Sequence, residues 1–282
     1  MNSFTTLDKD LKQCQFKVEM NEKVDVLDHG FVRLVDHMPS ENLDSAIVQA
    51  ARVSYGDGTK STRDDRGLIR YLLRHWHTTP FEMVEFKFHI KMPIYIARQH
   101  FRHRTASVNE LSARYSVVPE ELYEPVQLRK QSTINHQGSE GEFDASPELL
   151  NKLSNQLHTP FDVYNELIDN GCCREQARGV LPQATYTEFY WKINLHNLLH
   201  YLTLRMHETA QEEIREYAHA IFKIIEPLVP HTIEAFRDFR INTITLTGPE
   251  IECLNNGTLI TSPSEKREFQ EKMNRLRLRM PV

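Results

Sequence analysis

Glycine is scarce in this chain, with 10 glycines among 282 residues. Neither G-x-G-x-x-G nor G-x-x-x-x-G-K-[ST] occurs, so the two common backbone loops that cradle phosphates are absent. A nucleotide bound here would therefore be held largely by side chains. Cysteine is also scarce, and without a C-x-x-C pair the sequence favours neither a zinc ribbon nor a thioredoxin-type site. The adjacent Cys172 and Cys173 are interpreted as reduced thiols rather than a strained vicinal disulfide.

Long apolar runs are missing as well. No stretch is long enough to span a bilayer, and the first residues lack the apolar core of a signal peptide, so no membrane association and a cytoplasmic location are expected. The net charge of −5 argues against a general nucleic-acid binder. Any cationic site must be local.

The periodicity of the chain predicts an α/β (α+β) fold in which helices clad a largely antiparallel sheet. Residues 83–92 alternate apolar and polar side chains, which is typical of a strand with one wet face. Early strands are expected within 24–38. Helices are expected at 40–55, 66–76, 93–101, 147–171, 174–181, 194–206, 210–228 and 263–280.

The segment 129–146 is polar and contains two glycines, which predicts a loop. Residues 241–262 are rich in turn-forming residues and precede the charged helix at 263–280, which Ser262 would cap. The chain is therefore expected to contain one main domain, residues 1–240, and a C-terminal appendage, residues 241–282.

Residues 102–115, RHRTASVNELSARY, form an arginine-rich segment directly after apolar framework. The planar guanidinium of arginine matches phosphate and carboxylate groups bidentately. Arg102 and Arg104 would point the same way in an extended chain but diverge in a helix. Ser107 and Glu110 have capping-box spacing, which predicts a helix from about Val108. On such a helix, Glu110 and Arg114 could simply form an i,i+4 ion pair.

This segment matches R-H-R-x-x-S-x-N-E-x-S-x-R-Y at nine fixed positions, and in this it resembles the flavin-dependent thymidylate synthases. HTTPFE (77–82), ARQHFRHR (97–104), ARGVLP (177–182) and NLHNLLHYLTLR (194–205) resemble further segments of that family. The resemblance covers roughly 25–240. It implies the fold of that family and a methyltransferase that converts dUMP to dTMP. The carbon would come from 5,10-methylenetetrahydrofolate, and FAD reduced by NADPH would deliver the hydride. It also implies a homotetramer whose sites are shared between subunits.

The resemblance also implies site residues. The dUMP site would contain Gln99, His100, Phe101, Arg102, Glu110, Leu111, Ser112, Ala113, Arg114, Arg178 and Arg205. The FAD site would contain His77, Thr79, Arg102, His103, Arg104, Glu110, Asn194, Leu195, His196 and His200, although His200 stands where the family also has asparagine.

Arg205 has the most chemical role that the resemblance implies, namely to bind the uracil and promote its ionisation. Because arginine stays protonated, we interpret it as an electrostatic activator rather than a general base. On the residues alone, Arg205 would be a cation complementing the dipole at a helix end. Ser112 is interpreted as a hydrogen-bond donor, because a nucleophile needs an adjacent base. No cysteine lies in an activating context, so a cysteine nucleophile is not expected.

Two other classes compete with this reading. His196 and His200 are four residues apart on an expected helix and His207 follows, a spacing that metal-dependent hydrolases use. However, H-E-x-x-H is absent, and no metal site is expected. The arginine-rich segment could instead bind RNA. The negative net charge of the chain weighs against this, and so does the lack of aromatic residues placed between the basic ones.

Overall fold

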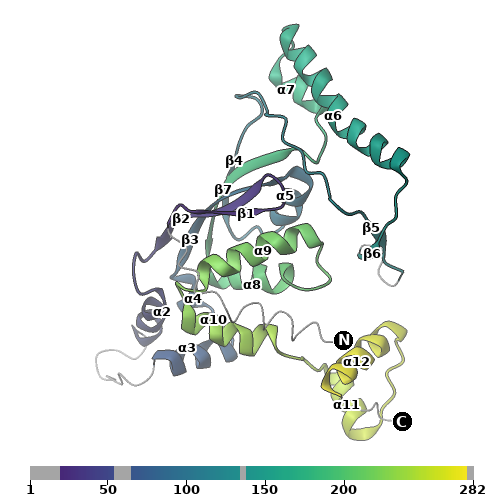
Figure 1. The fold of residues 1–282 in the computed structure, drawn as a ribbon. Coiled ribbons are helices and arrows are strands. Elements are labelled where there is room, and N and C mark those ends of the chain that lie inside the picture. Colours follow the sequence, from purple (N-terminus) through teal and green to yellow (C-terminus); the bar gives the residue numbers. More distant parts are fainter. Residues whose placement is uncertain (1–19, 54–64, 134–137, 278–282) are drawn as a thin grey trace. The chain divides into compact units, whose positions relative to one another are not determined.

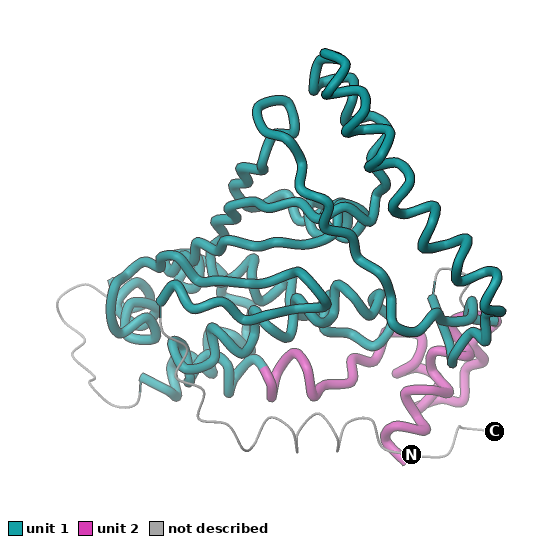
Figure 2. Tube along the Cα trace, turned by 45° about the horizontal axis from the view of Figure 1, so that its top comes forward, with its two compact units in different colours: residues 1–236 teal, residues 237–282 magenta. Residues whose placement is uncertain are grey.

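The computed structural model describes residues 20–53, 65–133 and 138–277. The chain divides into two compact units, Met1–Phe236 and Arg237–Val282, which Figure 2 shows in teal and magenta. The boundary predicted at 240/241 lies within the π-helical turn η3 (Arg237–Ile241), which opens the second unit.

Within the described part of the first unit, five antiparallel strands form one sheet in the order β1-β2-β3-β7-β4. Figure 1 shows α8 and α9 on one face of this sheet. The prediction of a largely antiparallel sheet clad by helices is therefore confirmed. The strands are β1 (Lys23–Val26), β2 (Gly30–Met38), β3 (Glu85–Pro93), β7 (Tyr186–Asn194) and β4 (Ser107–Glu110).

The central strand β3 carries the alternation expected at 83–92. Phe86, Phe88 and Ile90 are fully buried, and their side chains form the middle of the core. The opposite face of β3 is less exposed to solvent than predicted, because Lys91 is only 8% exposed. Its ammonium lies 2.6 Å from a Glu121 carboxylate oxygen, which compensates the buried charge.

The helices of the first unit largely follow the predicted pattern. The long helix α6 begins as expected: the Ser146 hydroxyl accepts a hydrogen bond from the Leu149 N–H at 3.3 Å. It is followed by Gly171 in the left-handed region, with φ +86°. These helices are α2 (Leu43–Arg52), α3 (Asp65–Arg74), α4 (Thr79–Glu82), α5 (Ile94–His100), α6 (Pro147–Asp169), α7 (Arg174–Ala177), η2 (Arg178–Val180), α8 (Leu195–Arg205), α9 (Glu212–Ile225) and α10 (Pro230–Phe236).

Two local predictions were wrong. The helix expected from Val108 is instead strand β4, in which Val108 pairs with Trp191 on β7. Pairing with a buried strand satisfies the backbone there, and this tertiary contact overrides the local capping signal. The loop expected at 129–146 contains a second small sheet of β5 (Arg129–Gln131) and β6 (Ser139–Glu142).

The second unit has a small core of its own, formed by Cys253, Phe269 and Met273. Two helices supply it, α11 (Gly248–Asn256) and α12 (Pro263–Leu276). Ser262 caps α12 as predicted, whereas α11 was not predicted because its sequence is rich in turn residues.

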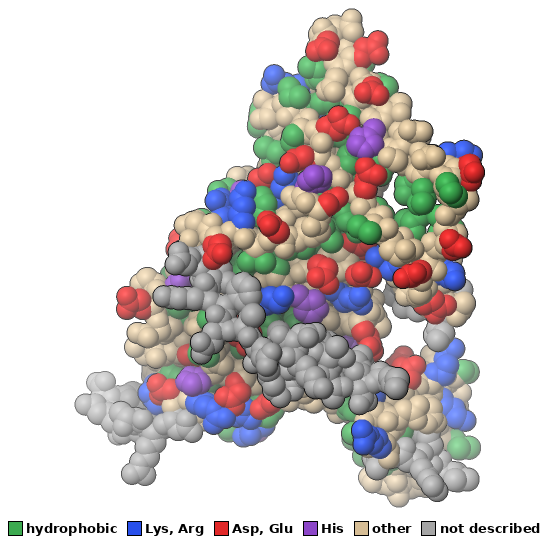
Figure 3. All heavy atoms as spheres, viewed as in Figure 1, with side chains coloured by type: hydrophobic (Ala, Val, Ile, Leu, Met, Phe, Trp, Pro, Cys, Tyr) green, Lys and Arg blue, Asp and Glu red, His purple; other side chains and the backbone are tan. Residues whose placement is uncertain are grey.

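No helix among the described residues is long and apolar enough to cross a membrane. On the face in Figure 3, acidic and basic side chains are interspersed over the atoms that are coloured.

Candidate functional site

The site is positioned by two connections at the sheet. β3 leads into α5, and the arginine-rich segment leaves α5 in a turn before pairing with β7 as the edge strand β4. β7 then leads into α8, which ends at Arg205. The N-terminal part of the arginine-rich segment therefore meets the C-terminal end of α8.

Arg205 is the centre of this meeting point. Its Nε donates a hydrogen bond to Nε2 of His103 at 2.9 Å, and a terminal nitrogen donates to the backbone oxygen of Gln99 at 3.1 Å. The guanidinium is half-buried. The guanidinium group is thus held by two acceptors from the chain around α5. A cation that only complements the helix dipole would not need these two hydrogen bonds.

His103 accepts from Arg205, so its ring must be neutral with the proton on Nδ1. Burial, together with the nearby Arg205 and His200, lowers the pKa of His103 to about 4. The ring packs against Tyr201 with centroids 4.8 Å apart. His103 therefore orients the Arg205 guanidinium without adding charge at neutral pH.

We expect His103 to titrate near pH 4. The folded pKa lies below the unfolded value of about 6.5, so folding stability decreases as pH falls from about 6.5 through 4. Replacing Arg205 by Met should raise the pKa of His103, yet leave it below 6.5 because the burial remains. Histidine-ring NMR titration, with His103→Gln identifying the signal, measures both values. A His103 pKa of 6.5 in the parent protein would contradict this half-buried, neutral ring.

His100 and Phe101 lie beneath the site. The His100 ring is fully buried, its Nδ1 is 3.1 Å from the Tyr201 hydroxyl, and its ring centroid is 4.3 Å from Trp191. Burial lowers the pKa of His100 to about 3, so this ring is neutral as well. The His100 ring belongs to the core, and only its backbone borders the site.

Arg102, Arg104 and Arg178 are exposed, and none of the three guanidinium groups makes an ion pair with another described residue. Arg102 and Arg104 lie on the turn that follows α5, not on a helix. Their donors therefore remain available for a ligand. Arg178 lies on η2, next to the small cluster of buried side chains around Phe161 that anchors α6.

Glu110, Ser112 and Arg114 of the segment have identifiable partners. A carboxylate oxygen of Glu110 accepts from the Thr187 hydroxyl at 2.8 Å. Arg114 lies 3.4 Å from Glu175 on α7, so the local pairing with Glu110 does not form. The Ser112 hydroxyl accepts from the Arg114 N–H at 3.3 Å, and within the described chain no histidine or carboxylate hydrogen-bonds to it. Leu111 is exposed and Ala113 half-buried beside it.

The proposed cofactor residues lie at the start of α8 and around α4. Asn194 caps α8: its side-chain oxygen accepts from the Asn197 N–H at 2.9 Å, which leaves its amide nitrogen as a donor. His200 is exposed and precedes Arg205 on α8, while Leu195 is fully buried and His196 half-buried. His77 and Thr79 are both exposed, and Thr79 is the first residue of α4. Among the described residues, no group of three or more His, Cys, Asp or Glu side chains could hold a metal ion.

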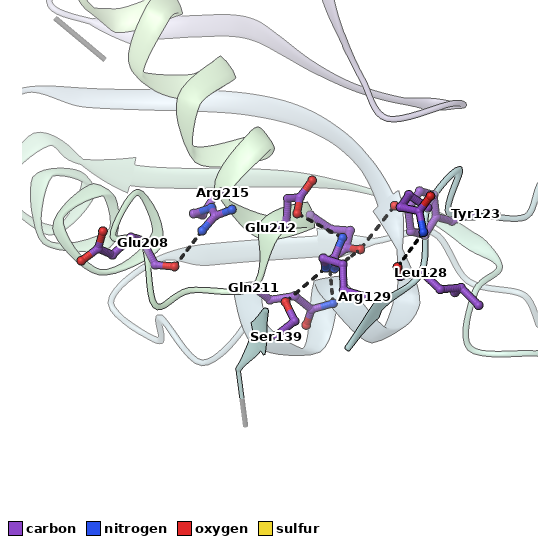
Figure 4. A network of polar contacts seen from close by, with 10 residues as sticks. Tyr123, Leu128, Arg129, Ser139, Glu208, Gln211, Glu212 and Arg215 are labelled. Atoms are coloured by element: carbon purple, nitrogen blue, oxygen red, sulfur yellow. Dashed lines mark hydrogen bonds and ion pairs between the residues drawn. The ribbon is translucent and has the colours of Figure 1, made fainter. Parts of the chain in front are cut away.

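Four polar residues near this site were not predicted, namely Arg129, Gln211, Glu212 and Glu213. Figure 4 shows Arg129, Gln211 and Glu212 within one network of polar contacts. Glu213 is only 3% exposed and accepts two hydrogen bonds from Arg129, at 2.7 and 2.9 Å. These residues also line a pocket of about 560 Å³. The only signal in the sequence was the run of glutamates at the start of α9, which usually marks a helix N-terminus.

Comparison with known proteins gives the family. A family model described as thymidylate synthase complementing protein matches residues 33–231. The flavin-dependent thymidylate synthase of Dictyostelium discoideum is 51% identical over 261 residues, which cover 89% of this chain and 86% of that protein. An enzyme of the same name from Thermus thermophilus is 52% identical over 243 residues, covering 86% of this chain and 88% of that protein.

A solved structure agrees with these relatives. The UMP/dUMP methylase PolB from Streptomyces cacaoi, bound with 5-Br dUMP, superposes with a TM-score of 0.68 and is 35% identical. The match covers 77% of this chain and 98% of PolB. By its fold, this protein has the architecture of that nucleotide methylase. The chain belongs to the family of thymidylate synthase complementing proteins, whose relatives above are flavin-dependent thymidylate synthases.

Proposed function

We propose that this protein is a flavin-dependent thymidylate synthase that methylates dUMP to dTMP. 5,10-methylenetetrahydrofolate would supply the carbon, and FAD, reduced by NADPH, would supply the hydride. The observation that carries the proposal is the meeting of Arg205 with His103 of the arginine-rich segment, in a chain about half identical to enzymes of that name.

The dUMP site would use the exposed forks of the arginines for phosphate and the amide of Gln99 for the uracil edge. His100 and Phe101 would border the nucleotide through their backbone. Ser112 would donate a hydrogen bond, and Glu110 would be held in place by Thr187. The full set remains Gln99, His100, Phe101, Arg102, Glu110, Leu111, Ser112, Ala113, Arg114, Arg178 and Arg205.

The residues present fit a flavin nucleotide. Arg102 and Arg104 are exposed without an ion pair to another described residue, and the Asn194 amide nitrogen donates to no residue in the described part of the chain, as a ligand with phosphates and ring acceptors requires. When bound, the flavin supplies hydride transfer. The proposed flavin residues are His77, Thr79, Arg102, His103, Arg104, Glu110, Asn194, Leu195, His196 and His200.

The chemistry of this chain's own residues would centre on Arg205. Its positive charge stabilises negative charge that develops on the uracil ring as the ring is activated toward the methylene carbon. His103 and the Gln99 carbonyl hold the guanidinium plane, so little reorganisation is needed at the moment of reaction. No cysteine or serine nucleophile enters this scheme.

We also propose a cytoplasmic homotetramer, with sites shared between subunits. Support comes from the exposed position of the proposed ligand residues, because side chains on an edge strand and a turn would leave two nucleotides largely uncovered within one chain.

The visible absorption spectrum of the purified protein, recorded before and after adding dUMP, tests the proposal. Flavin bands that shift with dUMP, followed by dTMP formation when methylenetetrahydrofolate and NADPH are added, are expected. A protein that takes up no FAD and binds no dUMP would overturn the proposal. A hydrolytic activity that is lost on treatment with a metal chelator would favour the metal-dependent hydrolase instead.

A further inference from the structure

A chain of side-chain contacts leads from the start of α9 to Gln99. The Gln211 amide nitrogen donates to the Glu213 carboxylate at 2.8 Å, and the Gln99 amide nitrogen donates at 2.5 Å to the Gln211 side-chain oxygen. We call Glu213, Gln211 and Gln99 the amide relay. Glu213 itself accepts from Arg129, which Figure 4 shows beside Gln211.

Glu213 fixes the direction of this relay. An ionised carboxylate only accepts hydrogen bonds, so Gln211 must turn its NH₂ group, not its oxygen, toward Glu213. Burial alone would raise the pKa of Glu213, but hydrogen bonds from Arg129 and Gln211 hold the pKa below its usual value. The carboxylate therefore stays ionised at neutral pH, and the reversed Gln211 amide would place two acceptors against each other.

The orientation of Gln211 then sets that of Gln99. With its oxygen facing Gln99, Gln211 is satisfied only by the Gln99 amide nitrogen. Gln99 keeps its own side-chain oxygen as an acceptor and its second N–H as a donor. The backbone oxygen of Gln99 accepts a hydrogen bond from Arg205 at 3.1 Å, so residue 99 is linked directly to the proposed uracil-activating group.

We propose that Glu213 is a positioning residue that selects uracil over cytosine by holding the Gln99 amide in one orientation through Gln211. This inference rests on the proposed function, in which Gln99 reads the pyrimidine edge. Uracil offers an N3–H donor and an O4 acceptor, which complement the free oxygen and N–H of Gln99. Cytosine offers an N3 acceptor and an N4 amino donor, and needs the reversed amide that the relay forbids.

Glu213→Gln tests the relay, because a neutral amide at position 213 can donate or accept and so permits both orientations. Dissociation constants of dUMP and dCMP are measured by calorimetry on the full-length, FAD-loaded protein. The parent should bind dUMP more tightly than dCMP. Glu213→Gln should reduce the ratio of the dCMP dissociation constant to the dUMP dissociation constant by about tenfold. Gln211→Met, which removes the middle of the relay at a half-buried position, should reduce the ratio similarly.

Glu212→Gln is the matched control. Glu212 lies 3.2 Å from the same Arg129 but makes no hydrogen bond to Gln211 among the described residues, so its substitution should leave the ratio unchanged. If the folded variants keep the parent ratio of dissociation constants, whether or not both nucleotides bind more weakly, the relay is overturned. The proposed function would still stand. A parent that binds neither nucleotide would overturn both.

Discussion

Replacing Arg205 by Lys should lower kcat/KM for dTMP formation by about 100-fold or more, since losing one preorganised donor typically costs about 10²–10³-fold. Lysine keeps the charge but loses the planar fork that donates to His103 and to the Gln99 backbone. Developing charge on the uracil would then meet a mobile ammonium instead of a preorganised group. Steady-state assays of dTMP formation, at saturating and limiting dUMP, measure the effect and divide it between kcat and KM.

Arg215→Lys provides a matched control for this substitution. Arg215 also donates from a guanidinium nitrogen to a backbone oxygen, that of Glu208, at 2.7 Å, but it has no place in the proposed site. We expect it to change kcat/KM less than about threefold, as surface substitutions usually do. An Arg205→Lys enzyme that turns over dUMP as fast as the parent would show that Arg205 has no activating role.

The largest expected effect on stability is that of Gly30→Ala. A Cβ atom at Gly30 would lie 2.0 Å from the Tyr217 hydroxyl oxygen, 2.6 Å from the Val26 carbonyl oxygen and 2.9 Å from the Lys91 carbonyl oxygen. Two of these are backbone atoms of paired strands and cannot move aside. Overpacking of this kind costs about 3 kcal/mol, which corresponds to a decrease in Tm of roughly 6–12 °C. Thermal unfolding followed by circular dichroism measures it.

Two comparisons isolate the cause of this loss. Gly179→Ala has no atom within 4 Å of the new Cβ, and its backbone is not in the left-handed region, so the change in Tm should be small. Adding Tyr217→Phe to Gly30→Ala removes the hydroxyl that the methyl group meets, and should restore part of the lost stability. A Gly30→Ala protein as stable as the parent would contradict the close packing of β1, β2 and α9 at this point.

The elements that sequence predicted best are those whose signals are local. The alternation along β3 is visible because the core lies on one side of the strand, and the ends of α6 are marked by Ser146, Pro147 and Gly171. Strand β4 was missed because its conformation depends on pairing with β7, which is distant in the sequence. Its own residues, Ser107 to Glu110, carry a helix-start pattern that only the tertiary contact overrides.

The candidate site likewise contains residues with a local sequence signal and residues that only a tertiary contact reveals. A fixed motif brought Arg102, His103 and Arg104 to attention, and family resemblance connected them with Arg205. No spacing in the sequence indicates that Arg205 donates to His103, since the contact depends on how α5 and α8 approach each other. The amide relay was likewise invisible, because glutamine and glutamate at a helix start are ordinary surface residues unless they are buried against another segment.

Asn194 has a consequence for how this position can vary in evolution. Its oxygen caps α8, and in the proposed function its amide nitrogen contacts the flavin nucleotide. Aspartate, serine or threonine can satisfy the cap, but none of them supplies the amide donor, whereas glutamine supplies a donor with the wrong reach for the cap. Selection for folding alone would accept several residues at position 194, so a lineage that keeps asparagine there is showing selection for ligand binding.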